Sequence, residues 1–162
     1  MFVYIQTTEK EWRPGSVLIP KDYPEHADYI PDFAEYMAEL YQKELVRAID
    51  EQRYVYKWGA LSVPYYEYKE KKNLSVKFWE RTGLLKNSIT YWQEGDKWVV
   101  GIDKNKRYPD TPVKVYKVAR YLEYGTSRGI PPRKLFRPLA RYLSKNVRRF
   151  WYKFLDEKGL EY

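Results

Sequence analysis

The fold of this chain depends on the stretch Tyr121-Leu-Glu-Tyr-Gly-Thr-Ser-Arg-Gly-Ile-Pro-Pro-Arg-Lys-Leu-Phe-Arg-Pro-Leu139. The residues before it place apolar side chains at helical spacing, and Gly125 stands where a residue with positive φ would end that helix. Two adjacent prolines then favour extended and turn conformations, because proline fixes φ and has no N–H to donate. Pro138 is best placed at the first position of a following helix. The stretch predicts a helix end, a rigid loop and a helix start, with two apolar side chains filling the core just outside the second helix: Leu135 and Phe136.

The length and composition of the chain favour one folded domain. Its 162 residues are enough for a single hydrophobic core, and a hydrophobic content of 44% excludes a chain that is disordered throughout. We expect residues 1–30 to form an N-terminal arm or edge and residues 31–162 to form one domain. The lack of cysteine excludes disulfides and thiolate chemistry. No run reaches the roughly 20 apolar residues of a membrane span and no signal peptide is recognisable, so we expect a soluble intracellular protein.

Hydrophobic periodicity predicts an α+β fold with three main elements. A helix over residues 31–52 carries one apolar stripe, and a long helix over residues 138–157 carries another. Short β-rich runs at 88–93 and 97–102 flank Glu94-Gly95-Asp96 and predict a β-hairpin. We therefore expect a small antiparallel sheet packed by an N-terminal and a C-terminal helix. The stripes are Phe33, Met37, Leu40, Tyr41, Leu45, Ala48 and Ile49 in the first helix, and Leu139, Leu143, Val147, Phe150 and Phe154 in the last.

Shorter segments carry local signals. Residues 2–5 suit a short strand, and residues 66–73 are so strongly charged that we expect a solvated segment. Three prolines are expected to interrupt regular structure in the N-terminal arm: Pro14, Pro20 and Pro24. The expected helix caps are Thr82 with Gly83, for a short turn that carries Leu84 and Leu85 inward, and Thr111 with Pro112, for the helix that ends at Gly125.

The residues do not predict an enzyme. The single histidine, His26, lies in the proline-rich arm without a partner motif, so neither a zinc site nor a catalytic triad is expected. Pro109-Asp110 resembles the first half of a metal-dependent nuclease motif, Pro-Asp…(Asp/Glu)-x-Lys. The next acidic residue, Glu123, is followed by Tyr124 and Gly125, so the lysine of that motif is missing. We expect no catalytic residues, no metal and no cofactor.

A net charge of +8 raises the question of a polyanionic partner. On the last predicted helix, a basic stripe lies about 200° around the axis from the apolar stripe. It consists of Arg137, Arg141, Lys145 and Arg148. Three interpretations remain open: a solvated helix face, sequence-independent contact with nucleic-acid phosphates, or contact with an acidic surface of a neighbouring subunit. The aromatic content of 19% fits either a core built from large rings or subunit interfaces.

Four motifs occur in order within residues 55–150. They are Trp58-x-x-Leu61-Ser62-x-x-Tyr65-x-x-x-Lys69, Thr82-Gly83-x-Leu85-x-Asn87-Ser88-Ile89, Tyr121-Leu122-Glu123-Tyr124-Gly125-Thr126 and Pro132-Arg133-x-x-Phe136-Arg137-Pro138-Leu139. This succession resembles the tail-completion, or neck, proteins of tailed bacteriophages, including the related virion-morphogenesis proteins of Mu-like phages. Two departures from that pattern are the longer loop between Ile102 and Val115, and Leu135-Phe136 in place of the more common Pro-Phe.

The resemblance implies a structural α+β subunit of the virion, assembled in the host cytoplasm, that completes or terminates the tail and joins it to the head. It implies a homo-oligomeric ring, hexameric in this family, with portal or connector and tail-tube proteins as partners. Packaged DNA would be contacted without sequence preference, and no membrane is involved. We expect the basic stripe to face the DNA channel or an acidic partner. An exposed docking loop is expected at Glu123, Gly125, Thr126, Arg128, Pro131 and Pro132.

The residues also support an alternative function. The chain would then be an accessory protein that binds DNA or RNA without sequence preference through its basic C-terminal helix.

Overall fold

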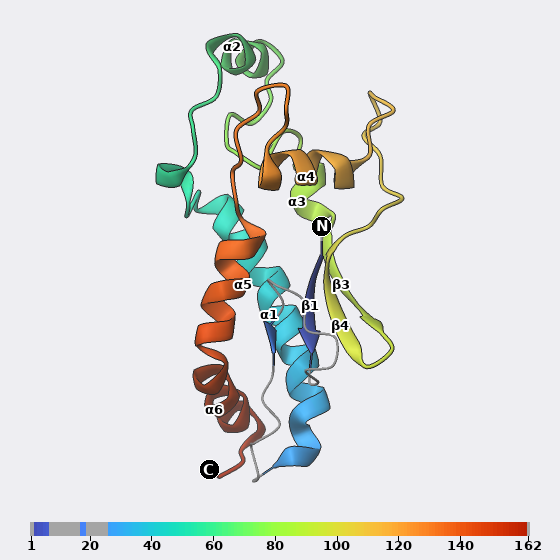
Figure 1. The fold of residues 1–162 in the computed structure, drawn as a ribbon, viewed down its shortest axis with the longest axis vertical. Coiled ribbons are helices and arrows are strands. Elements are labelled where there is room, and N and C mark those ends of the chain that lie inside the picture. Colours follow the sequence, from blue (N-terminus) through green and yellow to red (C-terminus); the bar gives the residue numbers. More distant parts are fainter. Residues whose placement is uncertain (1, 7–16, 19–25, 162) are drawn as a thin grey trace. The chain divides into compact units, whose positions relative to one another are not determined.

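The computed structural model describes residues 2–6, 17–18 and 26–161. Helices account for 51% of the described residues and the strands form one small sheet, so the predicted α+β class is confirmed (Figure 1). The chain packs into two compact units. Unit 1 comprises residues 44–90 and 102–136, and unit 2 comprises residues 2–43, 91–101 and 137–162. The single domain expected for residues 31–162 stays a prediction.

The sheet belongs largely to unit 2 and has the strand order β2-β1-β4-β3. Strand β1 (Phe2–Gln6), predicted at residues 2–5, runs antiparallel to β4 (Lys97–Ile102), with Val3 opposite Val100. Strand β2 (Val17–Leu18) pairs with β1 in parallel. The predicted hairpin is confirmed, because β3 (Ile89–Glu94) returns through Gly95-Asp96 into β4. The three prolines expected to interrupt the N-terminal arm lie outside the described residues.

The first predicted helix is confirmed as α1 (Ile30–Asp50), with Pro31 in its first turn. Its predicted apolar stripe is buried except for Leu40, which is half-buried. In unit 2, Phe33 of this helix packs against Trp151 and Phe154, with ring centroids 5.0 Å and 5.5 Å away. Large rings therefore build part of the core, which is one of the two uses expected for the high aromatic content.

The prediction of one continuous helix over residues 138–157 is wrong. The chain forms two helices, α5 (Phe136–Lys145) and α6 (Val147–Lys158), separated by Asn146. The Asn146 side chain donates a hydrogen bond to the carbonyl oxygen of Tyr142 at 2.7 Å, and this local bond competes with the backbone ladder. The apolar stripe changes at the break: Phe150 is half-buried, whereas Trp151 and Leu155 are buried.

Unit 1 contains a helix that overlaps the segment expected to be solvated, residues 66–73. Helix α2 (Val63–Lys71) begins after Ser62, with Pro64 in its first turn, where a missing N–H has no cost. Its charged residues favour a helix, and only one of its nine side chains, Lys69, is buried. The expected exposure is therefore confirmed for the rest of α2, whereas the helix itself was not predicted.

Both predicted cap positions in unit 1 need correction. Helix α3 (Leu84–Asn87) has Gly83 at its N-cap, with a φ of 81°, and Thr82 lies outside it. Leu85 is buried as expected, whereas Leu84 is half-buried. Helix α4 (Val115–Tyr124) has Lys114 as its N-cap, because Lys114 still pairs with Arg107 in a β-bridge. Thr111 instead accepts a hydrogen bond from the N–H of Val113, so neither Thr111 nor Pro112 caps the helix.

The stretch after α4 forms the predicted helix end, loop and helix start. Gly125 ends α4 with a φ of 75° and a ψ of −177°, a backbone conformation reserved almost entirely for glycine. The loop is closed by the N–H of Thr126, which donates to the carbonyl oxygen of Ile130 at 2.9 Å. Leu135 and Phe136 are fully buried, as predicted. The predicted helix start is wrong by two residues, because α5 begins at Phe136, which therefore lies inside the helix, and Pro138 is its third residue.

Candidate functional site

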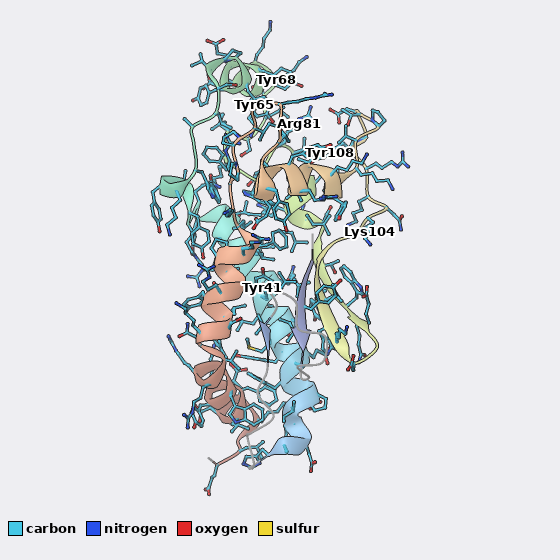
Figure 2. The ribbon with its side chains drawn as sticks, viewed as in Figure 1. Tyr41, Tyr65, Tyr68, Arg81, Lys104 and Tyr108 are labelled. Atoms are coloured by element: carbon cyan, nitrogen blue, oxygen red, sulfur yellow. The ribbon has the colours of Figure 1, made fainter. Side chains whose placement is uncertain are left out.

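A cavity of about 750 Å³ opens in unit 1. Its walls come from five segments: residues 60–69 with α2, residues 78–85, residues 108–113, α4 and the loop at 129–133. We call it the tyrosine groove, because four tyrosines line it together with three cations. The tyrosines are Tyr65, Tyr68, Tyr108 and Tyr121, and the cations are Lys69, Arg81 and Arg133. Figure 2 shows Tyr65, Tyr68, Arg81 and Tyr108 gathered in this part of unit 1.

Lys69 is the most unusual residue of the groove, because its ammonium group is buried. The side chain is 3% exposed, and Nζ donates hydrogen bonds to the carbonyl oxygens of Lys77 at 3.0 Å and Glu80 at 2.8 Å. The ring of Tyr65 lies 5.5 Å from Nζ. Burial lowers the pKa of Lys69 to about 8, because the charged form loses hydration; the carboxylate of Glu80 opposes that shift.

Arg133 is the second buried cation, at 5% exposure, and it ties three segments of unit 1 together. Its guanidinium donates to the carbonyl oxygens of Gly59 and Ala60 and lies 4.8 Å from the ring centroid of Phe78. Its own carbonyl oxygen accepts the indole N–H of Trp79 at 2.9 Å. Burial lowers the pKa of Arg133 as well. The groove therefore holds two cations whose hydrogen-bond acceptors are neutral carbonyl groups.

Arg81 and Tyr108 form the polar part of the rim. Arg81 donates to the hydroxyl of Tyr68 at 3.2 Å and to the carboxylate of Asp110 at 2.9 Å. Tyr108 is buried, and burial raises the pKa of its hydroxyl to about 12. Asp110, the acidic residue of the nuclease-like half-motif, therefore forms an exposed ion pair in this structure.

Glu123, predicted to lie exposed in a docking loop, is fully buried instead. Its Oε2 accepts the backbone N–H of Leu135 at 2.7 Å and that of Phe136 at 3.0 Å. These are donors at the start of α5, which have no partner inside the helix, and the carboxylate also meets the positive end of the helix dipole. Glu123 is therefore a structural cap, and its expected exposure is wrong.

The remaining residues of the predicted docking loop are accessible to different degrees. Arg128, Pro131 and Pro132 are exposed, whereas Gly125 and Thr126 are half-buried. Pro131 also lines the tyrosine groove. The loop is thus placed at the rim of the cavity, and its docking role stays a prediction.

The predicted basic stripe is exposed along α5 and α6, at Arg137, Arg141, Lys145 and Arg148. Arg148 donates a hydrogen bond to the hydroxyl of Tyr152 at 3.3 Å.

The net positive charge of the chain is concentrated in unit 1 and not in the unit that carries the basic stripe. By sequence, unit 1 carries 18 Lys and Arg against 9 Asp and Glu, a net +9, and unit 2 carries 12 against 13, a net −1. Because electrostatic attraction depends on local charge density, unit 1, which contains the tyrosine groove, is a stronger candidate than unit 2 for binding an anionic partner.

The structure shows neither a catalytic nor a metal-binding arrangement around the remaining residues that were considered for these roles, within the part of the chain that it describes. His26 Nε2 lies 2.7 Å from the carbonyl oxygen of Glu161, within hydrogen-bond distance. Within residues 2–6, 17–18 and 26–161, no group of three or more His, Asp or Glu side chains is placed to hold a metal ion.

Sequence reasoning missed the groove because its residues come from five separated segments. Tyr65 and Lys69 were part of a recognised motif, and their spacing of four residues would have placed them on one face of a helix. Residues 66–73 were interpreted only as a solvated segment, so that signal was not used. Tyr108 carried no signal, since only the tertiary structure brings its loop to α2.

The buried ammonium of Lys69 predicts a stability that rises with pH. A lysine with a pKa near 10.5 in the unfolded chain and about 8 in the folded one holds fewer protons when folded, so unfolding takes up a proton between those values. We expect the free energy of unfolding to rise by about 2 kcal/mol between roughly pH 7 and pH 9.5. Urea unfolding of the wild type and of Lys69→Met at both pH values would measure it. A pH response that is equal in the two proteins would contradict the assignment to Lys69.

Among the residues described, none of the helices has the length and apolar character needed to cross a membrane. Comparison with protein-family models, curated proteins and solved structures gives no match to this chain.

Proposed function

We propose that this chain is a structural subunit of the junction between head and tail in a tailed bacteriophage. In this proposal it forms a ring of identical subunits around the DNA channel, hexameric as the family resemblance implies, and joins the portal or connector to the tail. The virion is then its location, and it has no catalytic role.

The observation that carries the proposal is the apolar surface of unit 1. Of the twelve large hydrophobic side chains that are exposed among the described residues, eleven lie in unit 1. They are Val55, Tyr56, Val63, Tyr65, Tyr66, Tyr68, Val76, Val113, Tyr121, Tyr124 and Ile130. An apolar surface of this kind is typical of a protein that is covered by a partner, and tyrosine is enriched at the centre of such interfaces. Helix α2, exposed on eight of its nine residues, fits a segment that packs only in the assembly.

The motif residues support the family assignment within the proposal. Four of them hold unit 1 together from inside: Trp58, Lys69, Glu123 and Arg133. The indole N–H of Trp58 donates to the carbonyl oxygen of Lys134 at 3.2 Å, so it too links distant segments. Part of the resemblance thus rests on residues that build the scaffold of unit 1, and part on exposed residues such as Tyr65 and Tyr121.

Complementation of a phage that lacks this gene tests the proposal. A tagged copy is expected at the vertex where head meets tail in gold-labelled, purified particles. Replacing two strongly exposed apolar residues of unit 1, with Tyr56→Glu and Val63→Glu, should leave the fold intact and leave heads and tails unjoined, because a charge at a buried interface is unfavourable. Tyr142→Glu, at the exposed apolar residue of unit 2, is the matched control and should complement normally. Particles that carry none of the tagged chain would refute the proposal.

The second candidate is an accessory protein that binds DNA or RNA without sequence preference, favoured by the four exposed cations of the basic stripe on α5 and α6. If it is right, the purified chain should bind duplex DNA at physiological salt. The double substitution Arg141→Gln and Lys145→Gln should then lower the slope of log affinity against log salt by about 2, since each phosphate contact contributes about 0.9. Lys43→Gln, an exposed position on α1, serves as the control. Light scattering that shows a protein indifferent to DNA would exclude this candidate.

A further inference from the structure

We propose that the tyrosine groove binds a carboxylate side chain that a partner polypeptide presents between apolar or aromatic residues. The inference rests on the proposed function in one respect: it treats the groove as an assembly surface and names the chemistry of what docks there.

The first argument is the charge buried at the groove. Lys69 and Arg133 are both more than nine-tenths buried, and no carboxylate of the described residues lies within ion-pair distance of either. Their acceptors are backbone carbonyls, which satisfy hydrogen bonds without neutralising charge. Buried charges in proteins are normally paired with an opposite charge, because a charge that leaves water loses its hydration. Here two cations and the partly buried Arg81 line one cavity with a single carboxylate, Glu80.

Glu80 does not compensate these cations directly. Its carboxylate lies 3.6 Å from Nζ of Lys86, which also pairs with Asp50 at 2.7 Å. The Glu80 carboxylate attracts the Lys69 ammonium group and raises its pKa, but by less than the loss of hydration on burial lowers that pKa. A further carboxylate entering the groove would therefore find positive charge in excess.

The second argument is that Lys69 and Arg133 have more N–H donors than their hydrogen bonds to backbone carbonyls use. An ammonium group has three N–H donors, and the two carbonyl oxygens occupy two of those on Lys69. A guanidinium has five, and the bonds of Arg133 involve Nε and one of its two terminal nitrogens. A carboxylate accepts through two oxygens, and charge-assisted hydrogen bonds of this kind are about twice as strong as neutral ones.

The third argument is the apolar character of the walls. Tyr65 and Tyr68 stack with their ring centroids 6.2 Å apart and are each about 41% exposed. Val113 and Ile130 are exposed on the same lining. Apolar or aromatic residues beside the carboxylate would bury these surfaces and exclude water from the ion pair, which strengthens it.

These features favour a polypeptide over a nucleic acid. Proteins contact the phosphates of nucleic acids with exposed cations, whereas both principal cations of the groove are buried: Lys69 lies against the ring of Tyr65 and Arg133 against the ring of Phe78. A carboxylate on a side chain reaches a recessed cation, and its apolar neighbours then meet the walls.

A random heptapeptide library selected on the immobilised full chain tests the inference. We expect enrichment of one Asp or Glu flanked by aromatic or aliphatic residues. Because the protein is basic overall, acidic peptides can also bind without specificity, so the same selection is made on Arg81→Gln and on Lys117→Gln. Both variants lose one positive charge, but only Arg81 lines the groove, and Lys117 is exposed on α4. The motif should disappear with Arg81→Gln and persist with Lys117→Gln.

The enriched peptide is then titrated into the labelled protein and followed by NMR through the tryptophan indole N–H signals. The resonance of Trp79, which lines the groove, should shift, and replacing the acidic residue by its amide should weaken binding roughly tenfold or more. Lys69→Met should remove the preference for acid over amide. Loss of the fold in that variant would leave Arg81→Gln to decide the same question.

Several results would overturn the inference. They are enrichment without an acidic residue, a motif that survives Arg81→Gln, equal binding of acid and amide peptides, or shifts confined to residues outside the groove. Tight binding of free phenylacetate, equal to that of the peptide, would show a small-molecule site instead. None of these outcomes depends on where the chain sits in a virion, so failure here and failure of the proposed function are distinguishable.

Discussion

Replacing Glu123 by alanine is expected to lower the free energy of unfolding by about 4 kcal/mol, a large part of the stability of a domain of this size. The substitution removes the acceptor of two buried backbone N–H groups, those of Leu135 and Phe136. Each buried donor left without a partner costs about 1–3 kcal/mol, and the shortened side chain leaves a cavity where Glu123 is now fully buried. Urea unfolding followed by tryptophan fluorescence would measure the change.

Two further variants separate the causes of that loss. Glu123→Gln keeps an oxygen acceptor and nearly the same volume but removes the charge at the start of α5, so it should cost only about 1–2 kcal/mol. Glu67→Ala, at an exposed position of α2, should change stability by less than about 0.5 kcal/mol. If Glu123→Ala unfolds at the same urea concentration as Glu67→Ala, the capping role is wrong.

Replacing Gly125 by alanine is expected to destabilise the protein by about 3 kcal/mol, for two physical reasons. The φ of 75° with a ψ of −177° is unfavourable for any residue with a Cβ. A Cβ at this position would also lie 2.7 Å from the carbonyl oxygen of Ile130 and 3.1 Å from the ring of Pro132. That oxygen accepts the bond that closes the loop, so it cannot move without losing the N–H of Thr126.

Gly129→Ala is the matched control for this prediction. Gly129 also has a positive φ, 98°, but a Cβ there would meet nothing within 4 Å. We expect Gly129→Ala to cost about 1 kcal/mol, which reports the backbone strain without the collision. Thermal or urea unfolding of the two variants compares them directly. Equal losses would mean that the contact with Ile130 does not matter.

The elements that periodicity predicted well are those whose signal is local. The apolar stripe of α1 repeats at helical spacing over five turns, and the hairpin has β-rich runs on both sides of Gly95, so both were predicted nearly to the residue. The helix break at Asn146 was missed because asparagine is tolerated within helices, and its bond to Tyr142 is visible only in the structure. Helix α2 was missed because it has no apolar stripe to detect.

The sequence by itself determined the α+β class, the two apolar helices, the hairpin and the stop at Gly125, since hydrophobic spacing and backbone restrictions act between residues close in the chain. Only the tertiary structure decided that Glu123 is a buried cap and that Lys69 and Arg133 are buried cations. The same side chain is a solvated charge or a buried one depending on which distant segment covers it. Burial and electrostatic neighbours come from packing, and the groove exists only where five separate segments meet.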